Sequence, residues 1–143
     1  MTAKRLAGLV CALAAVGCGG GGGGGGKKAS CANVFTTAVD YAGQEVVVGC
    51  YYPGTYTIGA SITQTPGSCN AEFDWQATTG SPHGCAATLS GDATSGYDLD
   101  FESCSLPGSI HVAPDLSTFT GGFGWTVSCG SGTTTFQDIA KQE

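Results

Sequence analysis

The chain has 143 residues and a net charge of −6, with eleven acidic and five basic side chains. The charges are distributed unevenly, because all eleven carboxylates lie after Cys31 and Lys141 is the only basic residue there. The segment 31–143 therefore carries a charge of −10 and has the length of one domain. Such an acidic surface repels phosphate backbones, which argues against nucleic acid as a partner.

Residues 1–17 have the order of a secretory signal peptide. Two basic residues precede an apolar run over residues 6–16, which is too short to cross a bilayer as a helix, since that needs about 20 residues. The segment ends in Ala15-Val16-Gly17-Cys18. This order resembles the lipobox of bacterial lipoproteins, in which the cysteine is lipidated and becomes the first residue of the mature protein.

The resemblance departs from the usual lipobox at Ala15, where leucine is common, and an ordinary signal-peptidase cut near residues 12–14 is the alternative. Cysteine parity favours lipidation, because the ordinary cut leaves seven cysteines, whereas lipidation discards Cys11, blocks Cys18 and leaves six. The resemblance implies the lipid bilayer as a partner through Cys18. Gly19 in place of an aspartate after the cysteine further implies the outer membrane, with the periplasmic or surface face left open.

Residues 18–30 predict a lipidated cysteine followed by a flexible tether. Gly19–Gly26 have no side chains to pack, and the tether would span about 40 Å when fully stretched. Lys27 and Lys28 in this tether either contact anionic headgroups or are simply solvated. The expected folded domain is residues 31–143.

The segments after Cys31 predict an all-β domain of about eight short strands, because β-branched residues, alternation and turn residues recur along them. Residues 33–41 fit either a helix or a strand. Gly121-Gly122 has the form of a two-residue hairpin turn. The expected fold is a small antiparallel β-sandwich or barrel, linked by disulfides. The expected strands cover residues 45–52, 55–64, 71–78, 86–90, 97–102, 110–112, 117–120, 123–129 and 133–136.

Alternation of apolar and polar residues indicates which side chains point into the core. Trp75 and Trp125 both belong to apolar faces, so we expect them in the core rather than at the surface. The expected inward faces comprise Phe73, Trp75 and Ala77; Tyr97, Leu99 and Phe101; and Phe123, Trp125, Val127 and Cys129.

The expected domain contains six cysteines, namely Cys31, Cys50, Cys69, Cys85, Cys104 and Cys129. No two of them form a CxxC pair, which argues against a zinc or redox motif and favours three structural disulfides in an exported domain. Each disulfide would contribute about 3 kcal/mol. The sequence does not determine the pairing, although pairing between neighbours is the simplest expectation, since consecutive strands often lie side by side.

Asp98, Asp100 and Glu102 share one face of an expected strand, about 7 Å apart from one to the next. With Asp92 they form a candidate Ca²⁺ site of oxygen ligands, and the alternative is the solvated face of an amphipathic strand. The spacing is not that of an EF-hand. No cofactor and no metal is expected, and these carboxylates remain a weak calcium candidate.

Tyr51, Tyr52 and Tyr56 surround the Pro53-Gly54 turn and form a candidate ligand platform. Exposed rings at a turn can support a sugar ring, whereas the alternative is that they seal the end of a sheet by packing. A concave surface lined by the three tyrosines would favour the first interpretation.

No catalytic constellation is found in the sequence. His83 and His111 are the only histidines, and no HExxH, GxSxG or catalytic Cys–His pattern accompanies them. We therefore expect a non-enzymatic protein, acting at the membrane as an interaction or envelope-structural module. The alternative function is a carbohydrate- or Ca²⁺-binding β module.

Overall fold

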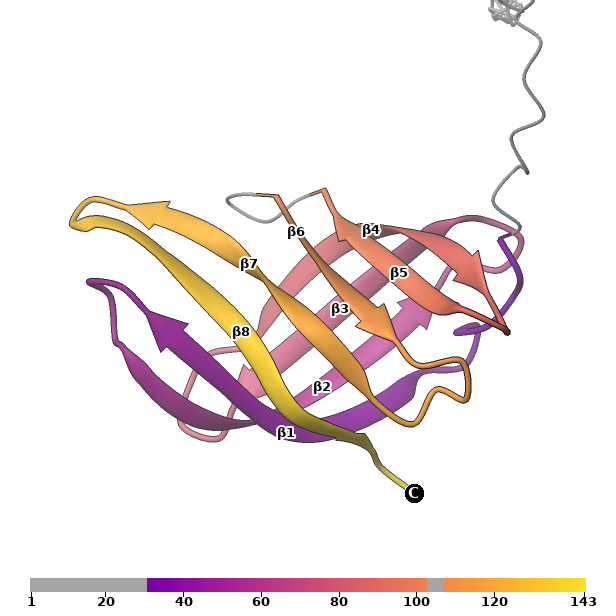
Figure 1. Cartoon of the computed structure of the whole chain (residues 1–143), viewed down its shortest axis with the longest axis horizontal. Coiled ribbons are helices and arrows are strands. Elements are labelled where there is room, and N and C mark those ends of the chain that lie inside the picture. The colour runs from indigo at the N-terminus through magenta and orange to yellow at the C-terminus, as the bar shows by residue number, and fades with distance from the viewer. Residues whose placement is uncertain (1–30, 103–106) are drawn as a thin grey trace, which may run out of the picture.

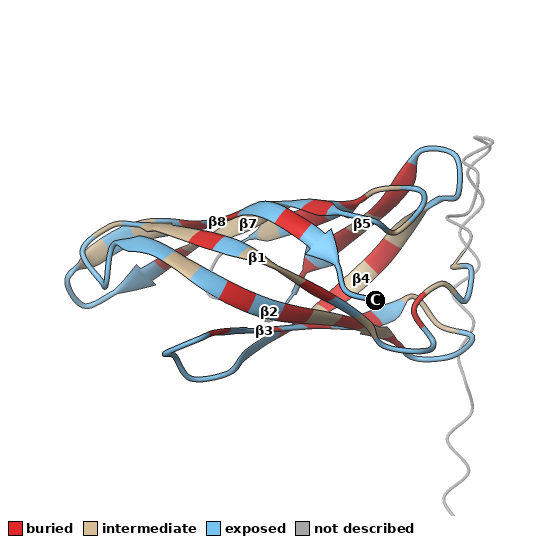
Figure 2. Cartoon of the chain, turned by 90° about the horizontal axis from the view of Figure 1, so that it is seen from below, coloured by how far each residue is buried: buried red, intermediate tan, exposed pale blue. Residues whose placement is uncertain are grey.

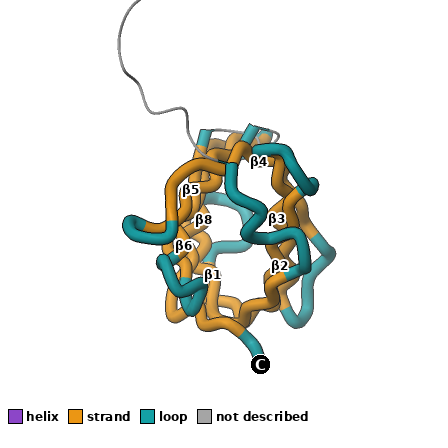
Figure 3. Tube along the Cα trace, turned by 90° about the vertical axis from the view of Figure 1, so that its right-hand side faces the viewer, coloured by secondary structure: helices purple, strands orange, loops and turns teal. Residues whose placement is uncertain are grey.

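The structure is a computed structural model that describes residues 31–102 and 107–143. Eight antiparallel strands follow one another in chain order and close into a barrel (Figure 1). Because β8 pairs with β1, the sheet has no free edge, and a view along the long axis shows the strands as a ring (Figure 3). The strands are β1 Val39–Val48, β2 Gly54–Gln64, β3 Asn70–Ala77, β4 His83–Asp92, β5 Gly96–Phe101, β6 Gly108–Val112, β7 Phe119–Val127 and β8 Gly130–Lys141.

The all-β, disulfide-linked fold is thus confirmed, and of the two expected architectures the chain adopts the barrel. The described residues contain no helix long and apolar enough to cross a membrane. Residues 1–30, with the expected signal, Cys18 and the tether, lie outside the described residues, and so does Cys104.

Three local predictions are wrong. Val127 and Cys129, expected on an inward face, are both exposed. β1 ends at Val48, so Tyr51 and Tyr52 lie in the β1–β2 loop and not in a strand. Gly121-Gly122 lies inside β7, and residues 128–129 form the turn to β8. A side chain at Gly121 would lie 2.8 Å from the backbone of Ile110, so this glycine allows β7 to pair closely with β6 rather than to turn.

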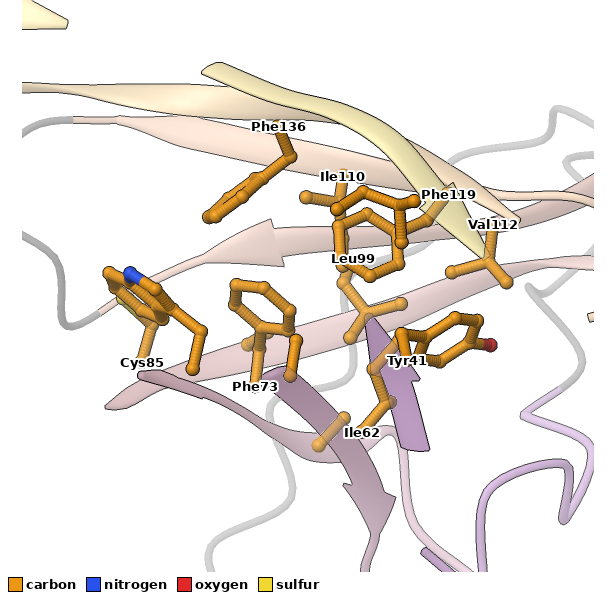
Figure 4. Packing of buried hydrophobic residues seen from close by; sticks show 14 of the residues in the cluster. Tyr41, Ile62, Phe73, Cys85, Leu99, Ile110, Val112, Phe119 and Phe136 are labelled. Atoms are coloured by element: carbon orange, nitrogen blue, oxygen red, sulfur yellow. The ribbon is translucent and has the colours of Figure 1, made fainter. Parts of the chain in front are cut away.

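The alternation predicted for β3 and β5 is confirmed, and exposed and buried positions follow each other along the strands (Figure 2). Phe73 lies at the middle of the barrel interior (Figure 4). Its ring stacks on Trp75 at 5.2 Å and on Phe101 at 5.5 Å, and it meets Phe119 and Phe136 edge to face. Such aromatic contacts add to the stabilisation that comes from burial alone.

One end of the barrel is closed by residues 31–38. Phe35 is fully buried there, with its ring 5.9 Å from that of Tyr97. Gln64, at the end of β2, is buried and holds this segment, because its Oε1 accepts hydrogen bonds from the backbone N–H groups of Val34 and Phe35 at 2.9 and 3.1 Å. Its Nε2 donates to the carbonyl of Ala32 at 2.9 Å, so both ends of the amide are satisfied.

The disulfides join Cys31 to Cys69 and Cys50 to Cys129, so the expected pairing of neighbours is wrong. Barrel closure explains the second bridge: β8 lies beside β1, which brings the β7–β8 turn next to the β1–β2 loop although 79 residues separate them. The first bridge fastens residues 31–38 to the β2–β3 turn. Cys85 is also disulfide-bonded.

Candidate functional site

A cavity of about 800 Å³ opens at the other end of the barrel. β2 runs from one end of the barrel to the other. It starts beside the cavity, near Tyr56, and ends at Gln64, which holds residues 31–38 at the closed end. The β1–β2 loop, the β3–β4 loop and the end of β7 surround the opening. Volumes of about 300–1,000 Å³ are typical of small-molecule sites, so this end of the barrel is the candidate functional site.

Glu45 supplies a carboxyl group to the cavity. Glu45 follows Tyr41 by four residues in β1, and both side chains are buried inside the barrel. Glu45 is only 8 % exposed and lines the cavity. Trp75 Nε1 donates a hydrogen bond to its Oε2 at 3.1 Å. Burial raises the pKa of Glu45, while the Trp75 hydrogen bond and the nearby His83 partly oppose this rise.

Aromatic rings form the walls of the cavity. The His83 ring stacks on Trp75 with centroids 5.2 Å apart, and Phe123 lies at the same distance from Trp75. Trp125 lies nearer the mouth, where Gly49 leaves room for it, since a Cβ at that glycine would lie 2.6 Å from the indole ring. Thr134 adds a buried hydroxyl-bearing side chain to the lining.

The rim carries the three tyrosines of the predicted platform. Tyr51 and Tyr52 are 56 % and 71 % exposed and their rings meet edge to face at 4.6 Å. The Tyr56 hydroxyl donates to the carbonyl of Tyr52 at 2.9 Å. Tyr51, Tyr52 and Tyr56 all line the cavity, so they border a concave surface.

The backbone of Tyr52 is strained, because its φ of 45° lies in the left-handed region that a bulky residue rarely adopts. Such strain costs about 1–3 kcal/mol and persists only when the surroundings impose it. Here the Tyr56 hydrogen bond and the neighbouring Cys50–Cys129 disulfide constrain the loop. The chain therefore holds an exposed aromatic ring at the mouth in spite of its local conformational cost.

Ser81, His83 and Glu45 line the same cavity and are the three residue types of a serine–histidine–acid catalytic triad. In the described part of the chain, however, no hydrogen bond joins any two of these three side chains. Activation of a serine nucleophile requires such a hydrogen bond to its base. The arrangement offers hydrogen-bonding groups and ring faces to a ligand.

β5, which carries the acidic residues Asp98 and Asp100, lies away from the cavity. Asp98 pairs across the sheet with His111, with 2.7 Å between Oδ1 and Nδ1, and both side chains are about half exposed. Glu102 accepts a hydrogen bond from Thr88, and Asp100 is exposed on the same face. Among residues 31–102 and 107–143, no three His, Cys, Asp or Glu side chains are grouped so as to hold a metal ion. Calcium binding here stays a prediction.

Sequence reasoning found the tyrosines of this site but missed Glu45, His83 and Phe123 as parts of it. It assigned Trp75 and Trp125 to the core, and both are buried, yet both also line the cavity. The one available signal was a carboxylate, Glu45, directly before a run of three valines, but this run does not show which face of the strand points inward.

Comparisons with protein-family models, with curated proteins and with solved structures give no match for this chain.

Proposed function

We propose that the protein is a lipid-anchored, non-enzymatic module of the bacterial envelope that binds a carbohydrate in the open end of its barrel. The observation that carries this proposal is the cavity of about 800 Å³, which has aromatic rings on its walls and rim and the carboxyl group of Glu45 inside. A purely structural barrel needs no such opening, because eight strands enclose a space that side chains can fill.

The chemistry of the lining fits a sugar. Trp125 and Tyr52 offer flat apolar faces that match the C–H face of a sugar ring. Glu45 and Thr134 offer polar groups that hydrogen-bond to hydroxyls and fix the orientation of the ring. A lining that combines aromatic and apolar side chains with a few convergent polar groups is typical of small-molecule sites.

The anchoring part of the proposal rests on the sequence of residues 1–30. Cys18 carries the lipid, the glycine-rich tether follows it, and Gly19 favours the outer membrane. The calcium alternative receives less support, because Asp98 already pairs with His111.

Tryptophan fluorescence tests the proposal directly, since both tryptophans of the chain line the cavity. The full-length protein, in a detergent without a sugar headgroup, is titrated with β-1,4-linked disaccharides of glucose, N-acetylglucosamine and glucosamine. We expect at least one of them to change the emission saturably and to be recovered unhydrolysed. Hydrolysis would contradict the non-enzymatic assignment.

Tyr52→Ser provides the matched variant for this titration. It removes an exposed ring at the mouth, so we expect weaker disaccharide binding with little change in melting temperature. His111→Ser, on the outer face of the barrel, serves as the control. If none of the disaccharides changes the emission at low-millimolar concentration, carbohydrate binding in the cavity is ruled out.

A further inference from the structure

Within the proposed carbohydrate-binding function, on which this inference rests, we infer that the ligand is an amino sugar whose protonated amine is bound by Glu45. The geometry that points to this ligand is a carboxyl group inside an aromatic cavity that contains no lysine or arginine. A neutral or N-acetylated sugar lacks the charge that this arrangement favours.

Glu45 is only half satisfied. Its Oε2 accepts the Trp75 hydrogen bond, whereas no donor in the described part of the chain reaches Oε1. The side chain is more than nine-tenths buried and lines the cavity, so Oε1 is available to a ligand. A buried carboxylate is costly unless it is paired and hydrogen-bonded, and an ammonium group supplies both the charge and the donors.

The surrounding rings add to the preference for a cation. An ammonium group near the face of Trp125 or Phe123 is attracted by the negative face of the ring. The interaction is stronger when water is excluded, as it is beside buried rings. The aromatic rings therefore stack on the sugar ring of the ligand, while Glu45 and the ring faces bind its protonated amine.

The charge of the whole domain favours the same ligand. Eleven carboxylates against one lysine in residues 31–143 produce a negative potential around the barrel. A cleft focuses such a potential and raises the local concentration of ligands of opposite charge. Cationic sugars are therefore enriched at the mouth before they contact Glu45.

The same three disaccharides test the inference, because they share the ring and linkage and differ at the 2-position. The titrations run from about pH 5 to about pH 7, because the amine of the glucosamine disaccharide must be protonated while Glu45, whose pKa is raised by burial, must be ionised. We expect this disaccharide to bind at least tenfold more tightly than the glucose disaccharide and the N-acetylglucosamine disaccharide. Equal affinities for all three would overturn the inference and leave carbohydrate binding intact, whereas no binding of any would refute the proposed function itself.

Glu45→Gln keeps the shape of the side chain and removes its charge. We expect the variant to bind the glucosamine disaccharide about tenfold more weakly than the wild-type protein, while its affinity for the glucose disaccharide stays within about threefold. Glu72→Gln removes a charge from the exposed face of β3 and should leave both affinities unchanged. A Glu45→Gln variant that loses affinity equally for both disaccharides would show that Glu45 acts only in shaping the cavity. The wild-type comparison stands even if this variant does not fold.

Discussion

The side chain of Tyr41 places a phenol hydroxyl in the core of the barrel. Its ring is buried against Phe119, and among residues 31–102 and 107–143 its hydroxyl has no hydrogen-bond partner. Burial, together with the negative charge of Asp115, raises the pKa of Tyr41 to about 12. The phenol therefore remains protonated in the fold over the whole physiological range.

Removing this hydroxyl should not harm the protein. We expect Tyr41→Phe to leave the free energy of unfolding unchanged or to raise it by up to about 1 kcal/mol, because a buried group without a partner carries a desolvation cost. The raised pKa means that the wild-type protein loses stability as the pH rises from about 10 to about 12, and Tyr41→Phe should lose less there. Urea denaturation at neutral and alkaline pH measures both effects, with exposed Tyr51→Phe as the control. A clear loss of stability at neutral pH would show that the hydroxyl is satisfied.

Glu45 couples stability to pH in the acidic range. Its pKa is raised in the fold, so the stability that its protonated form contributes is complete below the pKa of the unfolded chain and is lost as the pH rises through the folded pKa. Glu45→Gln cannot lose a proton, so we expect the melting temperature of this variant to rise relative to that of the wild-type protein as the pH increases from 4.5 towards neutrality. Melting curves of both proteins across this range test the sign, and a constant difference would contradict it.

At the scale of elements, the Cys50–Cys129 and Cys31–Cys69 disulfides lie at different ends of the barrel. Cys50–Cys129 ties the tyrosine-bearing β1–β2 loop to the β7–β8 turn at the mouth, whereas Cys31–Cys69 ties residues 31–38 across the closed end. Both close long loops, of 79 and 38 residues. Loop-closure entropy gives each a stabilisation of about 4 kcal/mol.

Removing each of these two disulfides in turn should therefore distinguish an effect on stability from an effect on ligand binding. We expect Cys50→Ser with Cys129→Ser to lower the free energy of unfolding by about 4 kcal/mol and also to weaken disaccharide binding, because the loop that carries Tyr51 and Tyr52 loses its tie. Cys31→Ser with Cys69→Ser is the matched control, with a similar loss of stability and unchanged binding at temperatures where the protein is folded. Equal effects on binding would contradict the role assigned to the mouth disulfide.

The strand faces could be predicted from the sequence because they depend on local alternation, as in β3 and β5. Closure of the barrel could not, since it depends on pairing between distant parts of the chain, such as Val48 with Thr133. The hairpin expected at Gly121-Gly122 failed for the same reason: pairing with strands on both sides outweighs turn chemistry. Glu45 was missed because its run of valines hides which face of β1 points inward.

At the scale of the whole molecule, anchoring is the property that the sequence predicts and that membrane fractionation can test. Because Cys18 carries the lipid in our proposal, Cys18→Ser should move the protein from the carbonate-washed membrane fraction to the soluble fraction. The wild-type protein should remain with the membranes. A Cys18→Ser protein that still pellets after the wash would refute lipidation as the anchor.

The closed end of the barrel also fixes the direction from which the cavity is reached. The chain enters the domain at Cys31, beside that end, while Tyr51 and Tyr52 mark the mouth at the other end (Figure 1). In our proposal the lipid lies upstream of Cys31, so the tether joins the barrel at its closed end and the mouth lies at the end away from the attachment point. A mouth at that end is open to ligands from solution or from polymers near the membrane. In our proposal the tether spans about 40 Å when fully stretched, and this length sets the depth of the layer that one anchored molecule can search.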